Sequence, residues 1–255
     1  MLDSRIIVVH TCAGLKSSSG GTSSAIVNIV NSLDKADIRV RLIYPFKSLD
    51  RLGDRLPRSD YILNQPSSFS GLLGYFLDLV KLVRKYNRQV IIHDHGIWLP
   101  SNIISFFIAT IFNLPFVLHP HGMLMDVAFS EKYYKKILCW HLYQKWILLK
   151  AHRIIVTSPA EKMSSRLFSY QDKIEVIPLI VDNECSLDRS DFTSRYDYIL
   201  FLGRKDKIKN LEGLIRAWKL VEDNLCSNIR LLLAGPSVGN YEFLLKEFSR
   251  SLGID

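Results

Sequence analysis

The feature that most constrains the fold is a repeated alternation of short apolar runs with longer helical patterns. Runs such as 5–10, 88–94 and 115–119 are almost continuously apolar, which is typical of strands buried on both faces of a parallel sheet. Between them, as in 22–33 and 72–86, apolar residues recur at helical spacing. Strand–helix–strand repetition of this kind predicts an α/β fold with a doubly wound parallel sheet.

The same alternation continues to the end of the chain. We expect strands at 5–10, 37–44, 88–94, 115–119, 152–158, 173–181, 197–203 and 229–235. We expect helices at 22–33, 72–86, 101–112, 129–150, 211–221 and 241–252, and a loop at 45–67.

A polar, acidic stretch divides this pattern into two predicted domains. Residues 183–196 lack apolar periodicity and are expected to be a linker. They follow an N-terminal Rossmann-like domain, 1–182, and precede a second domain, 197–255. The second domain holds barely two strand–helix units, too few to cover an open sheet. The chain of 255 residues is therefore expected to contain one whole domain and about half of another.

Charge and cysteine usage narrow the class of protein. The net charge is +8, which favours an anionic partner such as a nucleic acid, an acidic membrane surface or a phosphorylated ligand. The four cysteines show no Cys-x-x-Cys spacing, as expected of reduced thiols in a cytosolic protein. The apolar run 6–9 is too short for a signal peptide, and the stretch 103–118 is too short to span a membrane.

A glycine-containing segment, 14–24, joins the first predicted strand to the first helix. Ligands of open parallel sheets bind at this edge, where Gly20 and Gly21 let the backbone approach a phosphate or sugar. A helix that starts near Thr22 favours an anion at its N-terminus. The spacing matches neither a P-loop nor G-x-G-x-x-G. Taken alone, these residues are explained at least as well by a flexible loop with a Thr22 or Ser23 helix cap.

Two histidine pairs each end a predicted strand. They are His93-Asp94-His95-Gly96 and His119-Pro120-His121-Gly122. Residues i and i+2 of a strand share a face, so the pairs are candidates for metal ligands, acid/base groups or ligand-binding donors. Each pair continues into a turn, which would take the second histidine off the shared face, so we expect no metal. Two equivalent placements nevertheless favour a functional role for at least one histidine.

Two further segments are rich in cations. The helix 129–150 interleaves lysines with tyrosines and tryptophans. Such a helix can lie on an anionic membrane or bind nucleic acid, although a core-packed helix with a solvated basic face is the simpler interpretation. The segment 203–211 places Arg204, Lys205, Lys207 and Lys209 between a strand end and a helix start, which indicates a second anion site.

Taken together, the segments resemble a known family. They are HDHGIW, PFVLHPHGML, AHRIIVTSPAEK, KIEVIPLIVD, LFLGRKDKIKNLEGLIRAW and LLLAGP, in this order after the glycine-pair loop. This order is similar to that of the bacterial GT-B retaining glycosyltransferases of family four, the group-one sugar transferases of surface-polysaccharide synthesis. The resemblance extends from the first strand to residue 255.

The resemblance implies two Rossmann-like domains that face each other across a cleft. The C-terminal domain would bind a nucleotide-sugar donor and the N-terminal domain a saccharide or polyprenyl-diphosphate-linked acceptor. The sugar would be transferred with retention, in O-antigen, capsule or exopolysaccharide synthesis. The resemblance implies no metal or other cofactor and no nucleic-acid partner. It places the protein in the cytoplasm, where peripheral contact with the inner membrane is an open expectation.

The resemblance also implies the site residues. The catalytic set would be His121, which contacts the donor sugar, with Arg204 and Lys209 on the donor pyrophosphate. The donor- or acceptor-binding set would be Gly20, Gly21, Thr22, His95, Gly122, Gly203 and Asn210. His95 falls in the H-G-x-W segment, whose role is less defined.

The chain departs from the family pattern in two places. Asn210 stands where a glycine often follows the lysine. The family's element of two glutamates separated by seven residues is missing, because only four residues separate Glu242 from Glu247. We therefore expect a truncated donor domain, and the sequence leaves open whether the chain is active alone. A non-catalytic acceptor-binding or partner fragment, and a metal-dependent hydrolase built on the histidine pairs, are the alternatives.

Overall fold

The computed structural model describes most of the chain as two compact units. The described residues are 6–15, 21–45, 56, 62–64, 69–86, 89–180, 197–222 and 229–254. The first unit is Met1–Asp182 and the second Asn183–Asp255, and each is described here by itself. The predicted linker 183–196 and the predicted site residue Gly20 lie outside the described residues.

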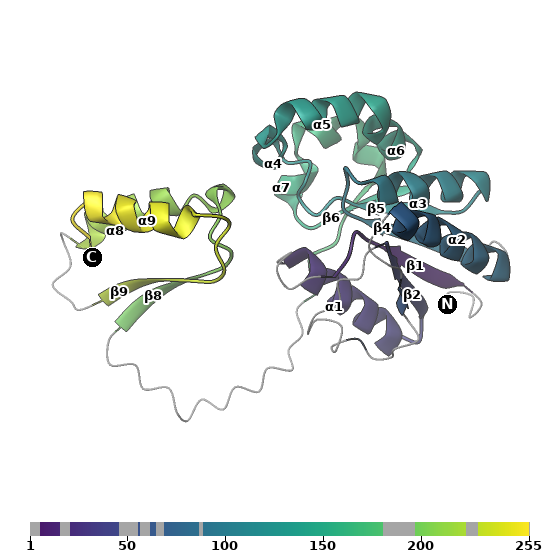
Figure 1. The fold of residues 1–255 in the computed structure, drawn as a ribbon, viewed down its shortest axis with the longest axis horizontal. Helices are drawn as coiled ribbons and strands as arrows, with labels where there is room; N and C mark the ends of the chain where they lie inside the picture. The colour runs from purple at the N-terminus through teal and green to yellow at the C-terminus, as the bar shows by residue number, and fades with distance from the viewer. Residues whose placement is uncertain are drawn as a thin grey trace. The chain divides into compact units, whose positions relative to one another are not determined.

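The first unit is built on a seven-stranded parallel sheet with the order β3-β2-β1-β4-β5-β6-β7 (Figure 1). The strands are β1 Ile7–Thr11, β2 Arg39–Tyr44, β3 Ile62–Asn64, β4 Val90–His95, β5 Phe116–His119, β6 Arg153–Val156 and β7 Ile174–Val176. The strand order reverses direction between β1 and β4. This doubly wound arrangement creates a switch point at the carboxyl ends of these strands, where such sheets bind ligands.

Helices cover both faces of this sheet. They are α1 Gly21–Lys35, α2 Phe69–Tyr86, α3 Pro100–Ile111, α4 Asp126–Ser130, α5 Tyr133–Cys139, η4 Trp140–Gln144, α6 Lys145–Lys150, α7 Pro159–Lys162 and η5 Ser165–Lys173. Helix α1 lies on the opposite side of the sheet from α2 and α3 (Figure 1). The expected α/β doubly wound fold is therefore confirmed for this unit.

Two hydrophobic clusters hold these layers together. Ile26 and Val30 of α1 pack with Leu42 on one face of the sheet. The cluster on the other face contains Ile43 and residues of α2, α3 and α6. Leu42 and Ile43 are neighbours in β2, so their separation follows from the two-residue period of a strand. Each fully buried aliphatic side chain of this kind stabilises the fold by about 1.5–3 kcal/mol.

The structure differs from the expected elements in three places. The predicted helix 129–150 is broken at Lys132, which adopts a left-handed φ of 53° between α4 and α5, and from Tyr133 to Lys150 it is continuous through the π-helical turn η4. The predicted strand 173–181 ends at Val176, and Pro178 beyond it has no N–H with which to extend the ladder. The predicted loop 45–67 contains the short strand β3.

The second unit contains one parallel strand pair with two helices. Its elements are β8 Asp197–Leu202, η7 Lys207–Lys209, α8 Leu211–Glu222, β9 Ile229–Ala234 and α9 Tyr241–Ser251. Ile215 and Trp218 of α8 and Leu245 of α9 pack against one face of the strands. On the other face Leu202 is 77% exposed. Within the described part of this unit, the helices therefore cover one face of the sheet.

Candidate active site

Four histidines gather on one face of the first sheet, at the carboxyl ends of three adjacent strands. His10 ends the apolar part of β1 beside His93 of β4, and His95 of β4 lies beside His119 of β5. These side chains lie on the face of the sheet that α1 covers, because along each strand they alternate with residues that pack in the core on the opposite face. His121 lies two residues beyond the end of β5 and extends the group to a fifth ring. We call these five residues the histidine cluster.

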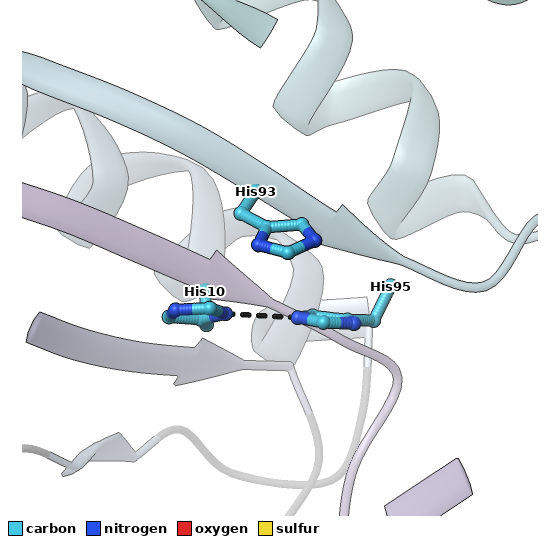
Figure 2. Close-up of side chains that lie close together, drawn as sticks. All are labelled: His10, His93 and His95. Carbon is cyan, nitrogen blue, oxygen red and sulfur yellow. Dashed lines mark hydrogen bonds between the residues drawn. The ribbon is translucent and has the colours of Figure 1, made fainter. Parts of the chain in front are cut away.

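The rings of the histidine cluster are in direct contact. His10 Nδ1 lies 2.8 Å from His95 Nε2, and His95 Nδ1 lies 3.0 Å from His121 Nε2. The rings of His119 and His121 stack with centroids 3.8 Å apart. Figure 2 shows His93 beside the contact between His10 and His95. The three rings of His10, His95 and His121 thus form a continuous hydrogen-bonded row.

Burial keeps the histidine cluster uncharged. Desolvation lowers the pKa of His10 and His119 to about 3 and that of His121 to about 4. It also lowers the pKa of His93 and His95 well below the ordinary value, with a further contribution from the neighbouring imidazoles. A neutral imidazole offers one N–H donor and one acceptor nitrogen. The cluster can therefore bind hydroxyl groups or a metal ion, but it does not supply positive charge near neutral pH.

The structure corrects one expectation about the two histidine pairs. The turns were expected to take the second histidine of each pair off the shared face, and this is wrong. His95 still belongs to β4, and the His121 ring returns to stack on His119. Sequence reasoning also missed His10, although its position at the end of the first apolar strand was a usable signal.

The turns that carry His95 and His121 have unusual backbone conformations. Trp98 and His121 have positive φ angles of 75° and 53°, which non-glycine residues rarely adopt. Gly122 follows with a φ of 77°, where any side chain would be strained. Strained backbone of this kind occurs often at functional sites, where the surrounding structure holds it in place.

A buried carboxylate holds the turn that carries His121. One oxygen of Glu161 accepts a hydrogen bond from the Gly122 N–H at 2.5 Å. The other accepts from the backbone N–H and the hydroxyl of Thr157, both at 2.9 Å. Sequence reasoning missed Glu161. Its signal was the capping pattern S-x-x-E that begins at Ser158, whose hydroxyl caps α7.

Asp94 lies between the two histidines of β4 in sequence but on the opposite face of the strand. It accepts hydrogen bonds from Thr11 Oγ1 at 2.5 Å and from Asn102 Nδ2 at 2.8 Å. Burial raises the pKa of Asp94 to about 7. Asp94 is fully buried against α3 and therefore belongs to the core rather than to the ligand-facing edge.

The predicted residues at the start of α1 lie at the same edge of the sheet, because α1 follows β1. Gly21 is the first residue of the helix and is exposed, while Thr22 is half-buried. A Cβ added at Gly21 would meet no atom within 4 Å, so this glycine is not required by packing. Ser23 is buried in the first turn.

In the second unit, the predicted anion-binding residues lie on one loop at the carboxyl end of β8. The loop is fixed to the end of β9, because the Gly203 N–H donates to Ala234 O at 2.9 Å and the Lys205 N–H to Pro236 O at 2.8 Å. A Cβ on Gly235 would lie 2.0 Å from the Gly203 carbonyl oxygen, so no other residue fits at this approach.

The four cations of this loop are not equivalent. Arg204 donates to Asp206 at 2.8 Å and Lys205 pairs with Glu242 at 2.7 Å. Lys207 and Lys209 are exposed. The sequence pattern therefore overstates the free positive charge of the loop, since carboxylates already neutralise two of its cations.

Asn210 closes this loop in a left-handed conformation with a φ of 51°. Asparagine tolerates this region better than most residues, which explains why it can replace the glycine of the family pattern. Glu242 pairs with Lys205, and Glu247 pairs with Arg250.

The structure thus brings seven of the ten predicted site residues together in two groups, whereas Gly21 and Thr22 belong to neither and Gly20 lies outside the described residues. In the first unit, His95 contacts His121, and Gly122 follows His121 in the same turn. The second unit holds Gly203, Arg204, Lys209 and Asn210 on a single loop. Each group lies at the carboxyl ends of parallel strands, the usual ligand edge of such sheets.

The first unit is Rossmann-like and carries the histidine cluster at its strand ends. A second strand–helix unit follows, with a cationic loop at the end of β8. The chain is therefore of GT-B type. Residues 19–184 match the sequence model of Glycosyltransferase Family 4. The chain belongs to this family. A search of curated protein sequences finds no match.

Solved structures share the fold at low sequence identity. Anabaena Alr3699/HepE in complex with UDP-glucose has a TM-score of 0.68 and 15% identity over 98% of this chain and 67% of its own. The apo form of the lipopolysaccharide outer core galactosyltransferase WaaB has a TM-score of 0.58 and 14% identity over 98% and 66%. TarM has a TM-score of 0.63 and 10% identity over 96% and 74%. The chain thus spans about two thirds of the length of the first two.

Proposed function

We propose that the protein takes part in transferring a hexose from a nucleoside-diphosphate sugar to a saccharide or lipid-linked acceptor, with retention of configuration, in surface-polysaccharide synthesis. Membership of the glycosyltransferase family supports the reaction class. The similarity of the fold to proteins solved with UDP or UDP-glucose supports the donor class. The observation that carries the proposal is the cationic loop 203–209, at the strand end where a diphosphate would bind.

The chemistry of this transfer fits the two groups of residues. Departure of a nucleoside diphosphate places negative charge on the leaving phosphate, and Arg204 and Lys209 would stabilise that charge from preorganised positions. The leaving phosphate can accept the acceptor's proton, so no strong base is required. In this proposal no metal takes part in the transfer.

In the same proposal the neutral His121 ring binds a hydroxyl group of the donor sugar. Its Nε2 is engaged by His95, so Nδ1 is the nitrogen left for the sugar. A neutral donor of this kind orients the sugar without repelling a cationic transition state. His95 would then hold the His121 ring in place rather than contact the sugar itself.

Replacement of Arg204 by alanine tests this proposal. We expect Arg204→Ala to lower transfer of glucose from UDP-glucose about ten- to a hundredfold. The expected loss lies below that of a fully buried donor because Arg204 is 39% exposed and already paired with Asp206. The measurement is multi-turnover release of UDP in the presence of a saccharide acceptor.

Arg250→Ala is the matched control, because it removes the same charge from an exposed position on α9 of the same unit. Equal activity of Arg204→Ala and wild type would contradict the role of the loop. Acceptor binding without any affinity for UDP or UDP-glucose would instead support the alternative function, a non-catalytic acceptor-binding fragment.

We further propose that the first unit binds an anionic membrane surface through the segment from α5 to α6. Tyr134, Leu138, Leu142 and Trp146 recur every four residues and are each more than half exposed, from 58% to 85%. Exposed lysines occur in the same segment: Lys132, Lys135, Lys145 and Lys150. An exposed apolar row combined with cations is typical of helices that lie in a membrane interface. No helix among the described residues has the length and apolar character needed to cross a bilayer.

Vesicle sedimentation tests the membrane surface. We expect the wild-type chain to sediment with vesicles that contain phosphatidylglycerol and to remain in solution with neutral vesicles. The double variant Leu142→Gln/Trp146→Gln is expected to lose most of this binding. Phe168→Gln is the matched control, since Phe168 is 73% exposed and lies outside the apolar row. Equal sedimentation of the double variant and the control would contradict the proposal.

A further inference from the structure

The inner part of the histidine cluster has the composition of a metal site. His10, His93 and His95 each place one ring nitrogen within 4.8 Å of a ring nitrogen of the other two. All three residues belong to the central strands β1 and β4 and are at most 8% exposed. Figure 2 shows the edges of the His10 and His95 rings meeting, with the His93 ring next to that contact. Their ligand atoms are therefore held close together by the rigid part of the sheet.

Several ring nitrogens of the cluster have no hydrogen-bond partner. Nε2 of His10 and Nε2 of His93 are buried and unpaired, and so are both ring nitrogens of His119. Buried polar atoms are nearly always hydrogen-bonded in folded proteins, and exceptions often mark an ion or water site. Packing alone does not explain this row of rings, because an aliphatic residue at any of these positions would avoid the unpaired nitrogen.

We propose that His10, His93 and His95 bind one divalent transition-metal ion, with Zn²⁺ the best match. Neutral imidazole nitrogens are preferred ligands of this ion, and three histidines are a common ligand set. The short contact between His10 Nδ1 and His95 Nε2, 2.8 Å, accommodates a proton. Two nitrogens on a tetrahedral zinc ion lie about 3.3 Å apart, so a small rotation of the rings admits the ion.

The surrounding contacts favour this inner triad over the outer one. His95, His119 and His121 also meet the distance condition. However, His121 lies outside the strands in a strained turn, and in the proposed function its free nitrogen is needed for the sugar. The inner triad uses only strand residues and leaves His121 available.

An ion on His95 Nε2 would determine the proton positions further out. The proton of the His95 ring must then sit on Nδ1, which donates to His121 Nε2 at 3.0 Å. Such hydrogen bonds orient metal-binding imidazoles in known sites. His121 would consequently carry its own proton on Nδ1. The ion takes no part in a bond-forming step. The need to leave His121 available for the sugar rests on the proposed function, whereas the placement of the three ring nitrogens of the inner triad does not.

Metal analysis of the full chain tests the site. The protein is purified without a polyhistidine tag, stripped with EDTA, dialysed against Zn²⁺ and analysed by mass spectrometry for bound metal. We expect about one Zn²⁺ per wild-type chain. We expect loss of the ion in His93→Gln and retention in His119→Gln, which belongs only to the outer triad, and in the surface control His141→Gln. Circular dichroism reports whether each variant is folded.

A second measurement does not depend on the variants. Co²⁺ added to the stripped wild-type protein is expected to give the visible absorption of a tetrahedral site, and Zn²⁺ is expected to raise the midpoint of thermal unfolding. Absence of both effects would overturn the proposal. Loss of Zn²⁺ in His119→Gln with retention in His93→Gln would place the ion in the outer triad and overturn the assignment. Neither readout depends on transferase activity.

Discussion

Acidification from about pH 7 to about pH 5 is expected to unfold the first unit. An unfolded histidine takes up a proton below a pKa of about 6.5, whereas the buried rings of the cluster do not. The folded pKa is about 3 for His10 and His119 and about 4 for His121, and it is also lowered for His93 and His95. These depressed values give stability that is present above pH 6.5 and lost as the pH falls towards them.

The size of this effect follows from the number of protons. Each proton bound only by the unfolded chain changes the free energy of unfolding by about 1.4 kcal/mol per pH unit. Asp94 acts in the opposite direction, because burial raises its folded pKa to about 7 and acidification therefore favours its folded form. On unfolding, the five histidines take up about five protons and Asp94 releases about one, so the net uptake is about four protons. The free energy of unfolding therefore falls by about 5 kcal/mol for each pH unit of acidification. Domains are typically stable by only about 5–15 kcal/mol.

Tryptophan fluorescence can follow this unfolding, since Trp98, Trp140 and Trp146 lie in the first unit. Urea unfolding is measured at a series of pH values with EDTA present. We expect His119→Gln to make the pH dependence shallower by about one proton. The exposed His141→Gln is expected to leave it unchanged. A first unit whose stability is the same at pH 7 and pH 5 would contradict the buried, neutral state of the cluster.

Much of the fold was predictable because strand and helix periods are local properties. The continuous apolar runs around Ile7 and Ile92 indicated buried parallel strands, and the helical spacing at Ile26 and Val30 indicated α1. The break at Lys132 was not predictable in the same way. It depends on a single left-handed residue and on the packing of α4 and α5 that local periodicity does not report.

The site was predictable only in part, because long-range contacts decide it. The spacing of His93 and His95 indicated a shared face, but only the parallel register of β1 with β4 brings His10 to them. Likewise, the sequence predicted four cations near Arg204, and the tertiary fold pairs Lys205 with Glu242 from α9. Such partners are far apart in sequence and follow no local pattern.

Replacement of Glu161 by alanine is expected to destabilise the first unit by about 2–4 kcal/mol. Glu161 is 1% exposed and accepts three hydrogen bonds, from the Gly122 N–H and from the N–H and hydroxyl of Thr157. Hydrogen bonds to a charged group contribute about 1.5–3 kcal/mol each, and buried donors left unpaired add a desolvation penalty. The expected total is smaller than the sum of three such bonds, because Gly122 and Thr157 are half-buried and water can replace part of the lost hydrogen bonding.

Urea unfolding of wild type, Glu161→Ala and Glu161→Gln measures this loss. The glutamine variant keeps one acceptor oxygen but turns an amide N–H₂ towards one of the donors, so we expect an intermediate loss. Glu175→Ala is the matched control, because Glu175 is exposed and its contact with Arg153 is 3.8 Å long. Exposed pairs of this kind contribute at most about 1 kcal/mol.

Replacement of Glu161 by alanine also separates a positioning role of this residue from a purely structural one. Among the described residues, Glu161 is the hydrogen-bond acceptor of the Gly122 N–H. Once its carboxylate is removed, the left-handed turn at His121 and Gly122 can relax. We expect Glu161→Ala, assayed where it is fully folded, to lower kcat for transfer more than it raises KM, because a relaxed turn misplaces the His121 ring. Normal kcat and stability equal to that of Glu175→Ala would show that Glu161 does not hold the turn.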